Sequence, residues 1–261
     1  MVVKIGVMDS GVGGLTVVEK LSCAIPDVQI IYYGDSGNCP YGNRSRTEII
    51  QLAQKVIQFL QEKEVTFICI ACNTISTVIK ELEKSCSIPL LSIVEPVAHY
   101  LATSLKPESI GVIATMDTIQ SKAYPQMIHA ENSEVHVVGQ GSATLADLIE
   151  RGEFNGDMIN HEIEEEMTKL LAQTSMKEVV LGCTHYPIVL DHFEQCFPQI
   201  TFINPAIYQA EAAKRQIHII DSLKKNQLKP IIYTSGDVTT FEKIVTKLNI
   251  SIQDQVKKQV M

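Results

Sequence analysis

The sequence has few of the features that would assign it to a membrane, disulfide-rich or nucleic-acid-binding class. It contains no uninterrupted apolar run near the roughly 18 residues that a membrane-spanning helix needs. Its seven cysteines, an odd number scattered over 261 residues, do not suggest a disulfide framework and fit a reducing compartment. With 22 basic and 30 acidic side chains, the net charge of −8 argues against a surface that displaces phosphate counterions. We therefore expect neither a membrane protein nor a nucleic-acid binder.

A secretion signal is also missing from the start of the sequence. Residues 1–7 form an ordinary strand pattern with no basic leader, apolar signal core or cleavage site, so a cytoplasmic location is expected. The hydrophobic content of 45% and the charged content of 20% are typical of a soluble globular protein. A chain of this length can bury a large core and form two domains. An acidic protein can still bind a small anion, because helix N-termini and backbone N–H groups act locally.

The chain shows a regular alternation of apolar runs and amphipathic stretches. The apolar runs predict strands at residues 2–7, 29–34, 67–71, 89–94, 110–114, 135–138, 179–181, 201–203 and 231–235. The amphipathic stretches predict helices at residues 15–23, 46–63, 119–130, 143–150, 161–172, 207–224 and 241–248, and another that follows Cys72 and runs through Ser85. Such alternation implies an α/β fold with mainly parallel sheets. We expect two similar α/β lobes facing a common cleft, the first made of residues 1–97 and 207–261 and the second of residues 98–206.

Two short stretches echo each other, and each follows a strand that reads as buried. They are Ala-Cys-Asn-Thr at residues 71–74 and Gly-Cys-Thr-His at residues 182–185. Cys72 and Cys183 therefore fall at the carboxyl ends of strands, where open α/β sheets bind their ligands. A single cysteine is more often a buried structural residue than a reactive one. The matched settings of this pair nevertheless favour one shared site in the cleft.

Two other patterns point to chemistry that the sequence supports less well. The glycine loop at residues 11–14 lacks the third glycine of a dinucleotide fingerprint, because Thr16 stands there. Cys69 and Cys72 have the C-x-x-C spacing of a redox pair or half a zinc site, but Cys69 lies inside an apolar strand and the sequence has no second such pair. No metal or other cofactor is expected. The remaining cysteines are interpreted as packing or surface residues: Cys23, Cys39, Cys69, Cys86 and Cys196.

Four longer motifs resemble those of the glutamate racemases in order and spacing. They are residues 9–16 (DSGVGGLT), 40–42 (PYG), 71–74 (ACNT) and 182–187 (GCTHYP). Weaker matches at residues 111–115, 150–152 and 234–237 extend the resemblance over nearly the whole chain. The resemblance implies an isomerase that interconverts L- and D-glutamate without pyridoxal phosphate and supplies D-glutamate for peptidoglycan. It also implies a homodimer.

Racemisation without a cofactor needs two acid/base groups, one on each face of the α-carbon. A thiol can serve, because helix N-termini and cationic neighbours lower its pKa and allow a thiolate and a thiol to coexist near neutral pH. By the resemblance, Cys72 and Cys183 are these two groups. Asp9 would then lie beside Cys72, and His185, supported by Glu150, would lie beside Cys183.

The resemblance also implies side chains that hold the substrate, since the carbanion-like transition state needs preorganised donors. They are Asp9, Ser10, Tyr41, Gly42, Asn73, Thr74, Thr115, Thr118, Thr184 and His185. Three segments depart from the usual family pattern, among them residues 142–147 ahead of Glu150, where Cys-Pro and Phe-Val-Pro are common. Ser36-Gly37-Asn38 replaces a Thr-Ala-Arg type of sequence, and Asn204-Pro205 replaces an aspartate-containing turn. An aspartate or broader amino-acid racemase, and a catalytically silent binding protein on the same scaffold, remain as alternatives.

Overall fold

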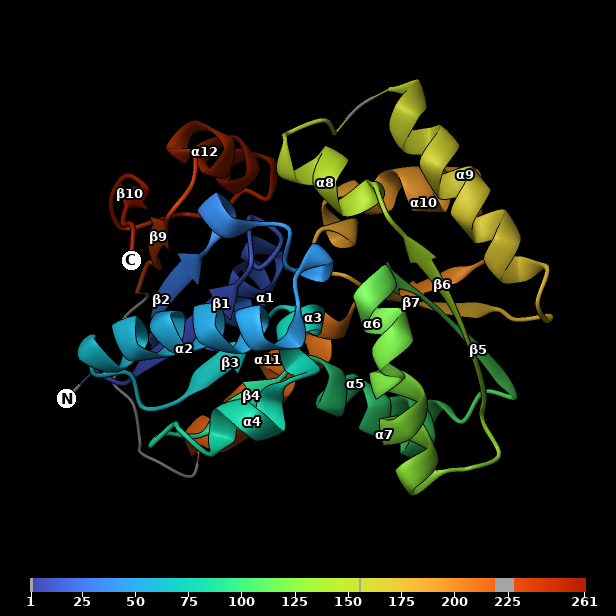
Figure 1. Cartoon of the computed structure of the whole chain (residues 1–261), viewed down its shortest axis with the longest axis horizontal. Coiled ribbons are helices and arrows are strands. Elements are labelled where there is room, and N and C mark those ends of the chain that lie inside the picture. The colour runs from blue at the N-terminus through green and yellow to red at the C-terminus, as the bar shows by residue number, and fades with distance from the viewer. Residues whose placement is uncertain (1, 155, 219–227) are drawn as a thin grey trace.

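The computed structural model describes residues 2–154, 156–218 and 228–261, and its strands form two parallel sheets (Figure 1). The first sheet contains, in spatial order, β10 (Lys257–Lys258), β9 (Ile231–Thr234), β2 (Gln29–Gly34), β1 (Lys4–Asp9), β3 (Ile68–Ile70) and β4 (Leu90–Ser92). The second contains β6 (His136–Ser142), β5 (Ser109–Thr115), β7 (Glu178–Gly182) and β8 (Thr201–Ile203). The paired strands run parallel throughout.

The two sheets repeat one strand order. The segment β2-β1-β3-β4 of the first sheet corresponds to β6-β5-β7-β8 of the second. In each sheet the chain winds first to one side of its starting strand and then to the other, so a switch point lies between β1 and β3 and again between β5 and β7. Loops diverge at such a point and leave a crevice at the carboxyl ends of the strands. The prediction of two similar α/β lobes is confirmed, while the division of the chain at residues 97 and 207 stays a prediction.

Helices connect the strands and cover the sheets (Figure 1). The α-helices are α1 (Leu15–Ala24), α2 (Arg46–Glu62), α3 (Asn73–Ser76), α4 (Ile79–Glu83), α5 (Val94–Tyr100), α6 (Met116–Ser121), α7 (Ala123–Glu131), α8 (Leu145–Glu150), α9 (Asp157–Leu171), α10 (Leu190–Cys196), α11 (Pro205–His218) and α12 (Val238–Lys247). Short 3-10 or π turns lie at Ser36–Asn38 (η1), Tyr41–Asn43 (η2), Leu101–Leu105 (η3) and Tyr186–Val189 (η4). No helix among the described residues is both long and apolar enough to cross a membrane.

The apolar core follows from the two-residue period of the first sheet's strands. Val7 and Tyr32 belong to a cluster that includes the apolar faces of α1 and α11, whereas Met8 and Tyr33 belong to a second cluster with α2. The first cluster continues into the second lobe, where it includes Leu181 and its neighbours on β7. The lobes therefore share one apolar core beneath the carboxyl ends of their strands.

Most predicted elements agree with the structure to within a few residues, and the differences have local causes. A capping box between Ser45 and Glu48 starts α2 where its apolar periodicity begins. The helix predicted after Cys72 is instead two short helices, α3 and α4, and the strand predicted through residue 94 ends earlier because α5 starts there, with Pro96 in its first turn. Residues 219–224 of the helix predicted over 207–224 lie outside the described residues.

Candidate active site

A small, partly open cavity lies where the carboxyl ends of the two sheets meet. Its wall includes Cys72 and Cys183, which follow β3 and β7, together with Ser10, which follows β1, and Thr115, which ends β5. Most of the predicted site residues line it: Ser10, Tyr41, Gly42, Cys72, Asn73, Thr74, Thr115, Cys183, Thr184 and His185. The cleft expected between the lobes is therefore confirmed. Asp9, Glu150 and Thr118 lie behind this wall and contact residues that form it.

Cys72 comes from the first lobe, at the N-cap of α3. Its Sγ lies 3.4 Å from Ser10 Oγ, and its side chain is buried. Burial raises the pKa of this thiol to about 12, and the charge of Asp9 adds to the rise. The cost of desolvating a thiolate here exceeds what the N-terminus of the four-residue helix α3 offers. Cys72 is therefore a thiol near neutral pH.

Asp9 ends β1 and is completely buried. Its Oδ2 accepts hydrogen bonds from the backbone N–H groups of Gly11 at 3.2 Å and Gly14 at 3.1 Å, and its Oδ1 accepts one from Thr184 Oγ1 at 3.3 Å. Burial raises the pKa of this carboxyl to about 6, although the charge of His185 and the two N–H groups oppose the rise. Asp9 thus titrates close to neutral pH, as a group that exchanges protons during a reaction needs to do.

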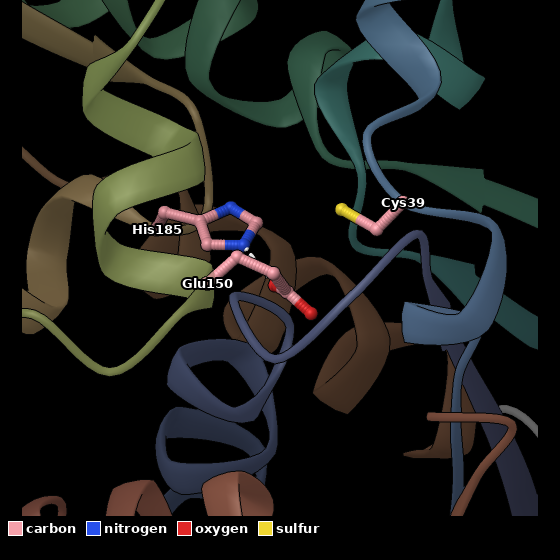
Figure 2. Close-up of side chains that lie close together, drawn as sticks. All are labelled: Cys39, Glu150 and His185. Atoms are coloured by element: carbon pink, nitrogen blue, oxygen red, sulfur yellow. Dashed lines mark hydrogen bonds and ion pairs between the residues drawn. The ribbon is translucent and has the colours of Figure 1, made fainter. Parts of the chain in front are cut away.

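Cys183 comes from the second lobe and is followed by a histidine that links it to a carboxylate. His185 Nδ1 lies 3.6 Å from Cys183 Sγ, and His185 Nε2 lies 2.6 Å from Glu150 Oε2. Figure 2 shows the Nε2 edge of the His185 imidazole directed at the Glu150 carboxylate. The predicted order of thiol, imidazole and carboxylate is present in the structure.

Two opposed pKa shifts set the charges of this second group. Burial alone lowers the pKa of His185, but hydrogen bonds and charge from Cys183 and Glu150 outweigh it and hold that pKa well above its usual value. Burial also disfavours the Glu150 carboxylate, yet hydrogen bonds from His185, Ser36 and the Val12 N–H lower its pKa. The pair is therefore an imidazolium and a carboxylate at neutral pH. A cation therefore lies beside Cys183, whereas Cys72 has an anion nearby.

The glycine loop after β1 allows the two lobes to approach closely. A Cβ at Gly11 would overlap the Glu150 carboxylate, and one at Gly13 would overlap Thr184 and His185. The residue between them, Val12, donates its backbone N–H to Glu150 Oε2 at 2.9 Å. The glycines are therefore required by contact with second-lobe side chains and not by a dinucleotide.

Hydroxyl and amide groups face the cavity from both lobes. Thr74 Oγ1 lies 3.2 Å from Thr115 Oγ1, which in turn is 3.0 Å from Thr118 Oγ1. Asn73 Oδ1 accepts a hydrogen bond from the Tyr124 hydroxyl at 2.8 Å, while its buried Nδ2 has no partner among the described residues. An amide held at its oxygen with a free donor on the cavity wall is suited to binding a carboxylate.

Comparison with known proteins decides the family. Residues 5–213 match the model of the Asp/Glu/hydantoin racemase family. The glutamate racemase of Thermoanaerobacter pseudethanolicus is 34% identical over 265 aligned residues, which cover 95% of this chain and 97% of that one. The chain belongs to the glutamate racemase family. Crystal structures of glutamate racemases from Bacillus anthracis (TM-score 0.89, 29% identity) and from Francisella tularensis in complex with D-glutamate (TM-score 0.87, 28% identity) each cover 99% of this chain and 97% of their own.

This racemase site contains residues that the sequence interpretation missed. Cys39, interpreted as a packing or surface residue, lines the cavity together with Pro40, Ala146 and Gly182. The segment between β2 and the predicted Tyr41 brings Cys39 there, and the peptide bond between Cys39 and Pro40 is cis. Its place directly before the PYG motif was the available signal.

A metal site was not expected, and one cluster in this racemase bears on that prediction. Cys39, Glu150 and His185 offer ligand atoms within 4.8 Å of one another (Figure 2). Glu150 and His185 already bond to each other, and burial raises the pKa of the Cys39 thiol well above its usual value. A cation there would have to displace the ion pair and deprotonate the thiol, so the donor set suits proton exchange better than metal binding.

The segment that departs most from the family pattern forms little of the wall. Ser142 is buried, donates to Glu162 Oε1 at 2.7 Å and accepts from the Leu145 N–H at 2.9 Å, so it supports the start of α8. Within residues 142–147, Ala146 lines the cavity. The departures therefore change the support of the wall more than its surface.

Proposed function

We propose that this chain is a cofactor-independent glutamate racemase in which Cys72 and Cys183 act as the two bases. The observation that carries the proposal is that two thiols from opposite lobes line one small cavity. Membership in the glutamate racemase family supports glutamate as the small-molecule substrate. A catalytically silent binding protein would not need an imidazolium at His185 paired with a carboxylate at Glu150 beside one of these thiols.

The proposed reaction begins with the substrate between the two thiols. Cys183, acting as a thiolate beside the His185 imidazolium, removes the α-proton of the enantiomer that presents it to the second lobe. The C–H electron pair stays on the substrate as a carbanion, and the Cys72 thiol donates its proton to the opposite face. Cys72 ends as a thiolate and Cys183 as a thiol, which is the starting state for the other enantiomer.

Asp9 is proposed to support the half of the reaction that involves Cys72. A thiol with a pKa near 12 is a poor base unless a neighbouring group takes part in its proton exchange. Asp9 has a pKa near 6 and lies at the same end of β1 as Ser10, which contacts Cys72. The substrate carboxylates are proposed to be held by donors on the wall, namely Ser10, Tyr41, Gly42, Asn73, Thr74, Thr115, Thr118 and Thr184.

The wider role rests on family membership alone. We propose that the D-glutamate formed supplies peptidoglycan synthesis, and that the enzyme acts in the cytoplasm as a homodimer. Sedimentation equilibrium of the full chain, of 28.9 kDa per subunit, tests the homodimer. A mass equal to one subunit at micromolar concentration would contradict it.

Exchange of the α-proton tests the proposed activity directly. Purified enzyme is incubated with L-glutamate in heavy water while proton NMR follows the α-proton and polarimetry follows the rotation. The α-proton signal is expected to disappear and the rotation to fall to zero, without added pyridoxal phosphate. Retention of both signals would refute a racemase, and a parallel incubation with L-aspartate distinguishes a glutamate enzyme from an aspartate or broader one.

A further inference from the structure

Ser36 belongs to the first lobe but contacts a residue of the second. It begins η1, directly after β2 and Asp35, and its Oγ donates a hydrogen bond to Glu150 Oε1. Glu150 is the last residue of α8 and supports the imidazole that contacts Cys183. Ser36 does not line the cavity. Its hydroxyl therefore reaches the chemistry only through Glu150.

The Glu150 carboxylate is held mainly from the first lobe. Its Oε1 accepts from Ser36, and its Oε2 accepts from the Val12 N–H at 2.9 Å and pairs with His185 at 2.6 Å. Of these three contacts, His185 alone comes from the second lobe. Gly11 lies so close to the carboxylate that a Cβ there would overlap it. The orientation of Glu150 is thus set by a loop and a hydroxyl across the cleft.

Ser36 is itself fixed by the loop in which it sits. Asp35 accepts hydrogen bonds from the Tyr41 hydroxyl at 2.6 Å and from Ser235 Oγ at 2.5 Å. A Cβ at Gly236 would overlap the Cβ of Ser36, so β9 and its following turn close the space behind it. A donor held by rigid neighbours can orient its acceptor without losing much conformational entropy.

We propose that Ser36 is a positioning residue for the second base: it orients Glu150 so that His185 presents its proton to Cys183. This inference deepens the proposed function and rests on it. Without the hydroxyl, Glu150 Oε1 loses its donor and the carboxylate can turn about its remaining contacts. The imidazolium then loses its alignment with Cys183, while Cys72, which Ser36 does not contact, keeps its surroundings.

The values of kcat/KM for the two enantiomers cannot reveal which thiol is affected. Enantiomers have equal free energy, so the equilibrium constant is one, and kcat/KM must have the same value in both directions for any variant. A primary isotope effect escapes this constraint, because it reports on each deprotonation separately. Enzyme is therefore assayed with α-deuterated L-glutamate and α-deuterated D-glutamate, each against its protonated form.

The experiment compares Ser36→Ala and Ser36→Thr with the parent, and uses Ser85→Ala as the matched control. Ser85 bonds to Leu82 O and Gln54 in the first lobe, remote from the cavity lining. Cys183→Ser, in which the second base is replaced, identifies the enantiomer that Cys183 deprotonates as the one whose isotope effect rises. For Ser36→Ala we expect kcat/KM to fall about 10-fold to 100-fold, the effect of losing one hydrogen bond to a charged group.

The decisive result is the asymmetry of the isotope effect. In Ser36→Ala the primary isotope effect should rise for the enantiomer that Cys183 deprotonates, as identified with Cys183→Ser, and not for the other enantiomer. Ser36→Thr, which keeps the hydroxyl, should restore the parent values. An equal rise for both enantiomers, or unchanged kinetics in Ser36→Ala, would overturn the proposal. If Ser36→Ala does not fold, Ser36→Cys gives the same comparison with a weaker donor. An inactive parent would refute the proposed function itself, so the two failures are distinguishable.

Discussion

At the scale of single residues, two buried acids of the site, Cys72 and Glu150, differ in how their burial is compensated. Cys72 and Glu150 are both withdrawn from water, but three hydrogen bonds keep Glu150 anionic, whereas one contact with Ser10 leaves Cys72 protonated. Desolvation favours the neutral form of an acid unless donors oppose it. In the proposed mechanism, Cys72 of the first lobe therefore starts as the proton donor, and Cys183 of the second lobe as the base.

The raised pKa of Asp9 predicts a decline of kcat/KM on the acid side of the pH profile. Because burial raises its pKa to about 6, its carboxylate form predominates above that pH and drops to about one tenth at pH 5. If the carboxylate assists Cys72, kcat/KM should decline below about pH 6. In Asp9→Asn kcat/KM should be lower at all pH values, and the decline below about pH 6 should be absent. A decline that persists unchanged in Asp9→Asn would assign it to another group.

Removal of either thiol tests the two-base assignment. Cys72→Ala and Cys183→Ala should each lower kcat by about 10²-fold to 10⁴-fold, the contribution of one acid/base group. Cys23→Ala, at an exposed cysteine, is the matched control and should match the parent. Rates are measured by polarimetry from each enantiomer. Near-parental racemisation in either active-site variant would contradict one base per face.

At the scale of elements, the loop that joins β1 to α1 also contacts the second lobe. The Val12 N–H in this loop donates to Glu150, and Thr16 Oγ1, in the first turn of α1, donates to Thr184 O at 3.2 Å. The glycines of the loop leave room for these second-lobe residues. The loop and the first turn of α1 thus contact the second lobe close to Cys183.

Gly11→Ala should damage this alignment without unfolding the first lobe. A Cβ there overlaps the Glu150 carboxylate, which must move, and a displacement of about 1 Å in a catalytic group can reduce the rate 10²-fold. Gly139→Ala is the matched control, because its Cβ would meet only the flexible side chain of Ile119. Activity and circular dichroism are measured on both. Equal activity of the two variants would show that the close approach at Gly11 is unimportant.

The sequence predicts the strand-end residues of the site well and its cross-chain contacts poorly. Cys72 and Cys183 were predictable because apolar runs locate the carboxyl ends of strands, and parallel sheets gather those ends. Cys39 and Ser36 were missed, since they reach the site through an irregular loop whose course depends on packing against β9 and α8, and the position of Cys39 before the PYG motif was the one signal for it. The break between α3 and α4 was missed because both helices lie within one continuous polar and apolar pattern.

At the scale of the whole molecule, the two lobes are joined by both their core and their cavity. The larger apolar cluster includes side chains of β1, β5 and β7, and the cavity above it is lined from both lobes. Since the proposed substrate contacts both lobes at once, its binding energy should oppose their separation. Ligand binding and unfolding of the two lobes are therefore expected to be linked.

Thermal unfolding measures this linkage. A ligand that binds the native state alone stabilises it by about 2.7 kcal/mol at 100 times its Kd, which for a chain of this size corresponds to a Tm increase of roughly 5 to 10 °C. We expect one calorimetric transition that shifts with glutamate and not with sodium chloride at the same ionic strength. Glutamate should raise the Tm of Gly11→Ala by less, because Glu150 is displaced in that variant. Two transitions of which glutamate moves one would show that a single lobe binds the substrate, contrary to a cavity formed by both.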